Sequence, residues 1–194
     1  MPTAETWSGS LYPHVKIHTI VAACRNSTFP RQNMTLNALT ALSPLDGRYA
    51  AKVETLRLYF SEYGLIRNRV RVEIEWLKAL AAAGEIPECP EFSGATVTEL
   101  NAVIVDFSVA DAEAIKAIEA RTNHDVKAME YWLKDRLAGN AEVMRVSEFI
   151  HFGCTSEDIN NVSHALMLKD AVGASLLPQL DGLIARLRDL AHQL

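Results

Sequence analysis

The chain has 194 residues, of which 49% are hydrophobic, and it carries a formal net charge of −5 at pH 7. This hydrophobic content suits a folded domain with a sizeable core and excludes a chain that is disordered throughout. The acidic balance argues against a nucleic-acid-binding surface, and no apolar run in the sequence approaches the length of a transmembrane helix. The three cysteines, Cys24, Cys89 and Cys154, are far apart and odd in number, which favours a reducing cytosol over a disulfide framework or a zinc site.

The first 33 residues differ from the rest because they show no amphipathic period. Pro2, Pro13 and Pro30 lie among scattered serines and threonines. A signal peptide would need a basic start and an uninterrupted apolar run, which this segment lacks. We therefore expect residues 1–33 to be a disordered or spurious extension, with Met34 as the functional start of the protein.

The first polar segment is Ser-Pro-Leu-Asp-Gly-Arg-Tyr, residues 43–49. Pro44 fixes one backbone angle and the Asp-Gly pair favours a tight turn. Such a turn would present Arg48, whose planar fork suits a phosphate or carboxylate, beside the Tyr49 hydroxyl. The alternative interpretation is an ordinary surface turn with a solvated arginine.

Apolar residues recur at steps of three and four from Leu56 to Ala83, which predicts one long helix that Gly84 would end. Two further helices are predicted over Val97–Phe107 and Ala110–Ala120, the second of them preceded by a Ser-x-x-Asp capping pattern. No alternating run of β-branched residues is long enough for a strand. The sequence therefore predicts an all-α fold.

The second polar segment is Arg-Thr-Asn-His-Asp-Val, residues 121–126. Asn123 or Asp125 could cap the helix that follows, which would carry apolar residues on its inner face and end at Gly139. His124 at this helix start could hydrogen-bond a phosphate or relay a proton. The alternative is a histidine with a purely structural role.

The third polar segment runs from Ser147 to Asn161 and collects a histidine, a Thr-Ser pair, three acids and two asparagines around Gly153. Gly153 can end a short helix with a positive φ, and Thr155 with Asp158 nearly forms a capping box for the next helix. In that interpretation the segment needs no ligand. In the other, the free amides and hydroxyls at this helix start cradle a substrate carboxylate or phosphate.

Apolar periodicity returns after Val162, and leucines between Leu176 and Leu194 step by four and three. Their face is broad, as in helices that are buried inside a bundle. Pro178 would lie in the first turn of this helix, where its missing amide is harmless. No glycine, proline or capping residue marks an end at Leu194, so we expect a truncated protein or an obligate assembly.

Several common signatures of catalysis are missing from the sequence. It has no glycine-rich phosphate loop, no paired-cysteine metal motif, no His-Glu-x-x-His and no Gly-x-Ser-x-Gly. Residue patterns alone therefore lead to an all-α, cytosolic and oligomeric protein with three polar segments at turns and helix starts.

Together these three segments resemble the bacterial adenylosuccinate lyases in residue types, order and spacing. Two neighbouring stretches, Thr122–Tyr131 and Ser163–Lys169, strengthen the resemblance. It runs from about Met34 to the last residue and does not include residues 1–33, which agrees with a late start.

The resemblance implies a fold and a reaction. The family belongs to the fumarase and aspartase superfamily, whose members are cytoplasmic all-α homotetramers with a central bundle of long helices. Its members cleave a C–N bond by β-elimination and release fumarate, converting adenylosuccinate to AMP and SAICAR to AICAR in purine biosynthesis. They use no metal and no organic cofactor. The implied partners are a nucleotide substrate and further copies of the chain, with no nucleic acid and no membrane.

The resemblance also implies roles for single residues. Arg48 and Tyr49 match the family's pair near the nucleotide phosphate. Asn123, His124 and Asp125 match its Asn-His-Asp, in which the histidine helps to hold the substrate and supports acid–base catalysis. Thr155 and Ser156 match the hydroxyl pair that meets the succinyl or fumarate portion.

The chain also departs from the family. The family's general acid lies in a Thr-His-Gly-Gln segment and its base in a Ser-Ser-x-Met-Pro-x-Lys loop, and neither occurs in these 194 residues. We therefore expect an N-terminal helical domain over 34–145 and an incomplete bundle over 146–194. We also expect no activity of this chain alone, since each proton-transfer group contributes a factor of roughly 10² to 10⁴ to the rate. Two alternatives are another superfamily lyase, such as argininosuccinate lyase, and a non-catalytic helical fragment or partner.

Overall fold

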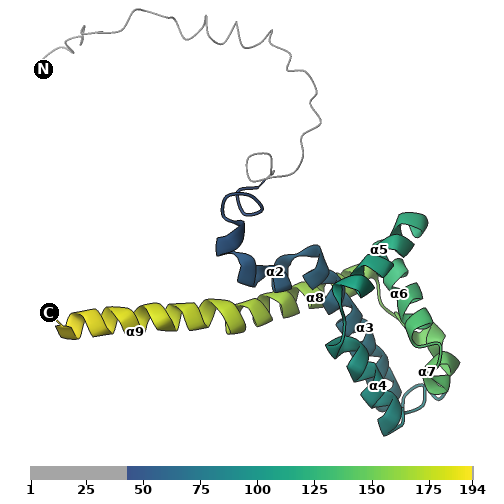
Figure 1. Ribbon diagram of the computed structural model, residues 1–194. Helices are drawn as coiled ribbons and strands as arrows, with labels where there is room; N and C mark the ends of the chain where they lie inside the picture. Colours follow the sequence, from purple (N-terminus) through teal and green to yellow (C-terminus); the bar gives the residue numbers. More distant parts are fainter. Residues whose placement is uncertain (1–42, 194) are drawn as a thin grey trace, which may run out of the picture. The chain divides into compact units, whose positions relative to one another are not determined.

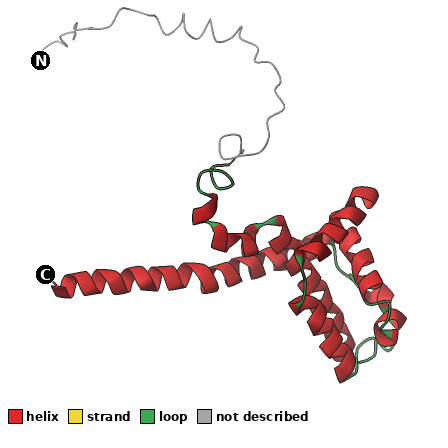
Figure 2. Ribbon diagram, in the orientation of Figure 1, coloured by secondary structure: helices red, strands yellow, loops and turns green. Residues whose placement is uncertain are grey.

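The computed structural model describes residues 43–193 (Figure 1). The chain divides into two compact units, Met1–Arg48 and Tyr49–Leu194. The expected extension over 1–33 and the expected start at Met34 lie outside the described residues. Within 43–193 every regular element is a helix, which confirms the predicted all-α class (Figure 2).

The described end of the first unit forms the predicted turn. The amides of Asp46 and Gly47 both donate to the Ser43 carbonyl at 3.1 Å, and the Leu45 amide donates to the Ser43 hydroxyl at 3.1 Å. Pro44 occupies the second position of this turn, which its fixed φ favours. The turn is therefore centred on Pro44 and Leu45, and Arg48 follows it with an exposed side chain.

The long helix predicted from Leu56 to Ala83 is wrong, because the structure divides it at Ser61. A short 3-10 turn, Ala50–Lys52, precedes α2 (Glu54–Phe60), and α3 (Glu62–Ala83) follows. Ser61 is extended, with ψ 167°, and its hydroxyl accepts a hydrogen bond from the Gly64 amide at 3.2 Å. A Cβ atom on Gly64 would lie 2.4 Å from the Tyr59 carbonyl oxygen, so the bend requires glycine there.

The next helices follow the sequence more closely. α4 (Gly94–Val105) begins three residues earlier than expected because the Ser93 hydroxyl caps it. α5 (Val109–Thr122) begins with the predicted reciprocal capping box of Ser108 and Asp111. Gly84 ends α3 in the left-handed conformation at φ 68°, as predicted.

α6 (Asp125–Arg136) ends earlier than predicted. Its C-cap is Leu137, not Gly139, and the amide of Leu137 donates to the carbonyl of Leu133 at 3.0 Å. The reason is local, because the Asn140 side chain caps a new short helix, α7 (Ala141–Arg145), and the intervening residues form a turn. A 3-10 turn, Ser147–Phe149, then leads into the third polar segment.

The core lies around α3, which packs against α4, α5, α6 and α8. The fully buried side chains of the core are mostly aliphatic and come from several helices. The largest are Ile74 and Leu77 of α3, Leu100 of α4, Ile115 of α5, Met129 and Leu133 of α6, and Ile159 of α8. Burial of each such side chain stabilises the fold by about 1.5–3 kcal/mol relative to exposure. Arg71 on α3 also pairs with Asp170 on α8 at 3.4 Å.

The last helical stretch has no break at Pro178. α8 (Ser156–Ala171) continues through a π-helical segment, η3 (Val172–Leu176), into α9 (Leu177–Gln193). A proline inside a helix removes one hydrogen bond and crowds the carbonyl four residues earlier. Pro178 is the second residue of α9 and so lies in its first turn, as predicted, although α9 follows the π-helical segment without a break.

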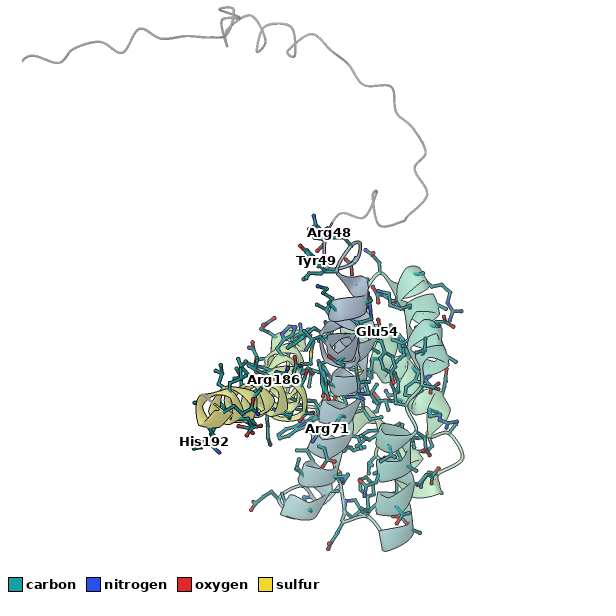
Figure 3. The ribbon with its side chains drawn as sticks, turned by 60° about the vertical axis from the view of Figure 1, so that its left-hand side comes forward. Arg48, Tyr49, Glu54, Arg71, Arg186 and His192 are labelled. Carbon is teal, nitrogen blue, oxygen red and sulfur yellow. The ribbon has the colours of Figure 1, made fainter. Side chains whose placement is uncertain are left out.

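α9 runs away from the packed helices of its unit, and Arg186 and His192 lie along it (Figures 1 and 3). Its large apolar side chains are exposed by 44% to 57%. They are Leu177, Leu180, Leu183, Ile184, Leu187 and Leu190. Among the described residues no helix is both long and apolar enough to cross a bilayer.

Candidate functional site

The second polar segment joins α5 to α6 through two adjacent residues with special roles. Asn123 ends α5 in the left-handed conformation at φ 52°, which asparagine tolerates better than most residues. His124 caps α6, and its Nδ1 accepts a hydrogen bond from the Lys127 amide at 3.1 Å. The expectation that Asn123 or Asp125 caps α6 is therefore wrong, because Asn123 is still part of the preceding helix end.

The cap fixes the state of the His124 ring. A ring nitrogen that accepts a hydrogen bond carries no proton, so the neutral ring holds its proton on Nε2. The His124 side chain is 53% exposed. The arrangement thus presents a donor on the outer side of a helix start, where the helix dipole also favours a negatively charged ligand.

Asp125 is held by a buried cation from α3. Arg69, which is 7% exposed, places a guanidinium nitrogen 2.7 Å from Asp125 Oδ2 and donates from Nε to Asn160 Oδ1 at 2.8 Å. Burial alone would raise the pKa of Asp125, but the Val126 amide and the Arg69 guanidinium outweigh it and lower that pKa below its usual value. Arg69 therefore ties the second polar segment to the third, in which Asn160 lies.

The third polar segment contains the capping box that the sequence predicted. The Asp158 carboxylate accepts from the Thr155 amide at 2.7 Å and from the Thr155 hydroxyl at 2.8 Å, and the Asp158 amide donates back to that hydroxyl at 3.4 Å. These two donors lower the pKa of Asp158. Ser156, the first residue of α8, is half-buried and takes no part in the box.

A buried carboxylate of α3 contacts the same segment. Glu73 is 1% exposed, and its Oε1 lies 2.6 Å from Nδ1 of His151. Burial raises the pKa of Glu73, although the hydrogen bond and charge of His151 oppose the rise. His151 adopts φ 65°, a left-handed conformation that costs a non-glycine residue roughly 1–2 kcal/mol.

Sequence reasoning did not select Arg69, Glu73 or His151 as site residues. A signal was nevertheless present, because Arg69 and Glu73 are four residues apart on the face of α3 that its apolar period buries. Charged side chains on a buried helix face are rare unless they have partners. Such a pair predicts partners elsewhere in the chain without saying where they are.

Of the predicted site residues, Asp125 is linked through Arg69 to the third polar segment. Within the second unit, Arg69 brings Asp125 and Asn160 together. Tyr49 is 38% exposed at the beginning of that unit, and Arg48 belongs to the first unit. The convergence of Arg48 with His124, Thr155 and Ser156 stays a prediction. No group of three or more His, Cys, Asp or Glu side chains suited to a metal ion occurs within residues 43–193.

Comparison with known proteins supplies the family. A family model described as "Lyase" matches residues 47–194, which include Arg48 and both later polar segments. The chain belongs to this lyase family. Proteins named adenylosuccinate lyase are 55% identical to it in Escherichia coli K12, 54% in Vibrio cholerae and 41% in Buchnera aphidicola from Acyrthosiphon pisum, each over 160 residues. The resemblance found in the three polar segments is therefore confirmed.

These alignments cover 82% of this chain but 35% of each relative. The chain thus spans about a third of the length of the curated relatives that it matches. The lyase family is shown for that portion.

Proposed function

We propose that these residues form part of an adenylosuccinate lyase, which cleaves adenylosuccinate to AMP and SAICAR to AICAR and releases fumarate by β-elimination. The observation that carries the proposal is the 55% identity to the Escherichia coli adenylosuccinate lyase over 160 residues. In this reaction a base removes a proton from the succinyl group, the adjacent carboxylate stabilises the carbanion, and an acid protonates the departing nitrogen.

The proposed roles of the residues follow from their chemistry. Arg48 and Tyr49 bind the nucleotide phosphate, for which a guanidinium and a hydroxyl are suited. Asn123 and His124 hold the substrate, His124 through the Nε2 donor that its cap leaves outward. Asp125 acts through Arg69, since its carboxylate is already engaged at 2.7 Å.

Thr155 and Ser156 meet the succinyl portion, but the two hydroxyls differ in availability. The Thr155 proton is committed to Asp158 at 2.8 Å, so Thr155 must exchange that carboxylate for the carboxylate of the substrate. The Ser156 hydroxyl takes no part in the capping box. Ser156 is therefore the more direct donor to the substrate, and Thr155 the residue that sets where α8 begins.

We further propose that the working enzyme is a cytoplasmic homotetramer. The exposed apolar face of α9 supports assembly, because bundle helices bury such faces against one another. The 194 residues by themselves contain neither the family's general-acid segment nor its base loop, so this polypeptide alone releases no fumarate at an enzyme-like rate.

A chimaera tests the proposal. Residues 43–193 of this chain would replace the aligned residues of the Escherichia coli adenylosuccinate lyase, and fumarate release would be measured with adenylosuccinate and with argininosuccinate. We expect turnover of adenylosuccinate only. A chimaera that folds into the same assembly as the parent enzyme but turns over neither substrate, or argininosuccinate instead, would contradict the assignment.

Variants of the chimaera locate the roles. R48A should lower kcat/KM by at least tenfold, whereas the matched control R145A, which removes an exposed side chain of α7, should leave it unchanged. The alternative of a non-catalytic helical partner, favoured by the exposed face of α9, predicts instead that the 194-residue chain co-purifies with a full-length lyase without restoring activity to inactive subunits.

A further inference from the structure

The Glu73 carboxylate is unusual because it is buried and only half satisfied. One oxygen contacts the His151 ring at 2.6 Å, and the other, Oε2, is buried without a hydrogen-bond partner. Its neighbours along α3, Val70, Ile74 and Leu77, are buried aliphatic residues. Stability does not explain an ionised carboxylate here, since an apolar side chain of similar size would fill the same space without desolvating a charge.

The partner of Glu73 lies in a tight turn before α8. His151 at φ 65° and Gly153 at φ 71° are both left-handed, on either side of Phe152. The Cys154 amide donates to the His151 carbonyl at 3.3 Å and closes the turn. Such a turn holds one non-glycine residue in a strained conformation, so contacts from elsewhere in the fold must hold it there.

α3 supplies two such contacts, three residues apart on one face. Glu73 holds the side chain of His151, and the Trp76 indole N–H donates to the carbonyl of Phe152 at 2.8 Å. Two consecutive residues of the turn are therefore attached to one rigid helix. Thr155 and Ser156 follow Cys154 directly as the cap and the first residue of α8, so the attachment of the turn fixes where their hydroxyls lie.

We propose that Glu73 is a positioning residue, which acts through the His151 ring to hold the 151–154 turn and thereby places the Thr155–Ser156 hydroxyls at the start of α8. The use of these hydroxyls toward substrate rests on the proposed function above, whereas the positioning itself does not. The raised pKa of Glu73 agrees with this assignment, because it reflects burial that stability alone does not explain.

The test uses the 194-residue chain labelled with ¹⁵N, without substrate. Three variants are compared by NMR: E73M, which keeps the side-chain length and removes both oxygens; E73Q, which keeps a hydrogen-bonding group; and E75M, the matched control. Glu75 is exposed on α3 and pairs with Lys78, not with the turn. The reporters are the His151 ring nitrogens, the Trp76 indole N–H and the amides of Thr155 and Asp158.

We expect E73M to move the His151 Nδ1 resonance to the position found for the exposed His164, and to shift the Thr155 and Asp158 amides well beyond the changes in E75M. E73Q should restore most of both shifts, because its side chain still reaches the ring. E73M should remain folded, since it replaces a half-satisfied buried carboxylate by an apolar group. If Glu73 only filled space, E73M would leave the His151 ring signals unchanged, and E73Q would have no shift to restore.

The proposal is overturned if E73M is folded and leaves the His151, Thr155 and Asp158 signals as they are in E75M. If E73M does not fold, H151N decides, because asparagine tolerates the left-handed conformation but removes the ring. Amides of Thr155 and Asp158 that stay unshifted in H151N would equally overturn it. These signals are read without substrate, so a failure of the proposed function would appear only in the chimaera assay.

Discussion

α6 and α8 each begin at a residue that we predict to bind substrate, yet His124 and Thr155 serve their helices in different ways. At α6 the cap uses one nitrogen of the His124 ring, and the second nitrogen remains available to a ligand. At α8 the Thr155 hydroxyl both donates to and accepts from Asp158, so the cap uses the only proton that this hydroxyl could donate to a ligand. Capping and ligand binding can therefore coexist at α6, whereas at α8 they compete.

The two starts also differ in what holds them to the rest of the fold. The α6 start is tied by an ion pair between Asp125 and the buried Arg69, and the α8 start is reached through the turn that Glu73 and Trp76 hold. Both attachments come from α3. The α6 start is therefore held by an ion pair and the α8 start through hydrogen bonds to the turn before it, and mutations can separate the two.

The largest effect should come from D125A, which leaves the buried Arg69 without its charged partner. We expect a loss of about 3 kcal/mol in the free energy of unfolding, the lower end for a broken buried ion pair because the Asp125 side chain is 43% exposed. Chemical denaturation of the 194-residue chain measures it. D135A, which removes an exposed carboxylate from the same helix, is the control and should change stability by less than about 0.5 kcal/mol. Equal effects of the two variants would show that the Arg69 pair does not hold the α6 start.

T155A should have the next largest effect, since it removes the hydroxyl of the capping box. The expected loss is about 1 kcal/mol in the free energy of unfolding, and T155S should recover most of it because serine caps equally well. S156A, which removes the neighbouring hydroxyl outside the box, should stay within about 0.5 kcal/mol of the parent. If S156A were as damaging as T155A, the separation between cap and ligand donor at α8 would be wrong.

H124A should destabilise α6 by about 0.5–1 kcal/mol, because a cap hydrogen bond at an exposed helix start is lost. H124N should be nearly neutral for stability, since asparagine is a strong capping residue. In the chimaera, however, H124N should still lose substrate binding, measured as a rise in KM. Retention of full activity by H124N would mean that His124 serves the helix alone.

The smallest effect concerns pH and follows from the opposite shifts of two carboxyl groups. Asp158 has a lowered pKa in the folded state, so the stability that it contributes is present above its ordinary value of 3.8 and is lost as the pH falls through the folded pKa. Glu73 has a raised pKa in the folded state. The stability that its protonated form contributes is therefore fully present below pH 4.5, its ordinary pKa, and is lost as the pH rises through its pKa in the folded state.

Unfolding curves between pH 2 and 7 measure both contributions. D158N should reduce the fall in the free energy of unfolding at acid pH. E73Q should reduce the fall in the free energy of unfolding that occurs above pH 4.5. A D158N profile that runs parallel to that of the unmodified chain at every pH would be inconsistent with a carboxylate held by the Thr155 donors.

The sequence by itself determined several features that depend on residues within one or two helical turns. The all-α class follows from periodicity, and the capping boxes at Ser108 and Thr155 follow from a spacing of three. The left-handed end at Gly84 follows from the lack of a side chain. The residue types and order of the three polar segments were specific enough to indicate the family on their own.

Only the tertiary structure decided which residues of α3 support those segments. Arg69 reaches Asn160 across 91 residues and Glu73 reaches His151 across 78, and no local pattern encodes contacts at such separations. The break at Ser61 is different, because it rests on local contacts, the Ser61 cap and the close approach of Gly64 to the Tyr59 carbonyl, which the uninterrupted apolar period concealed. Caps and periods arise from hydrogen bonds and spacing along one helix, whereas buried charges acquire their partners only when separate helices pack together.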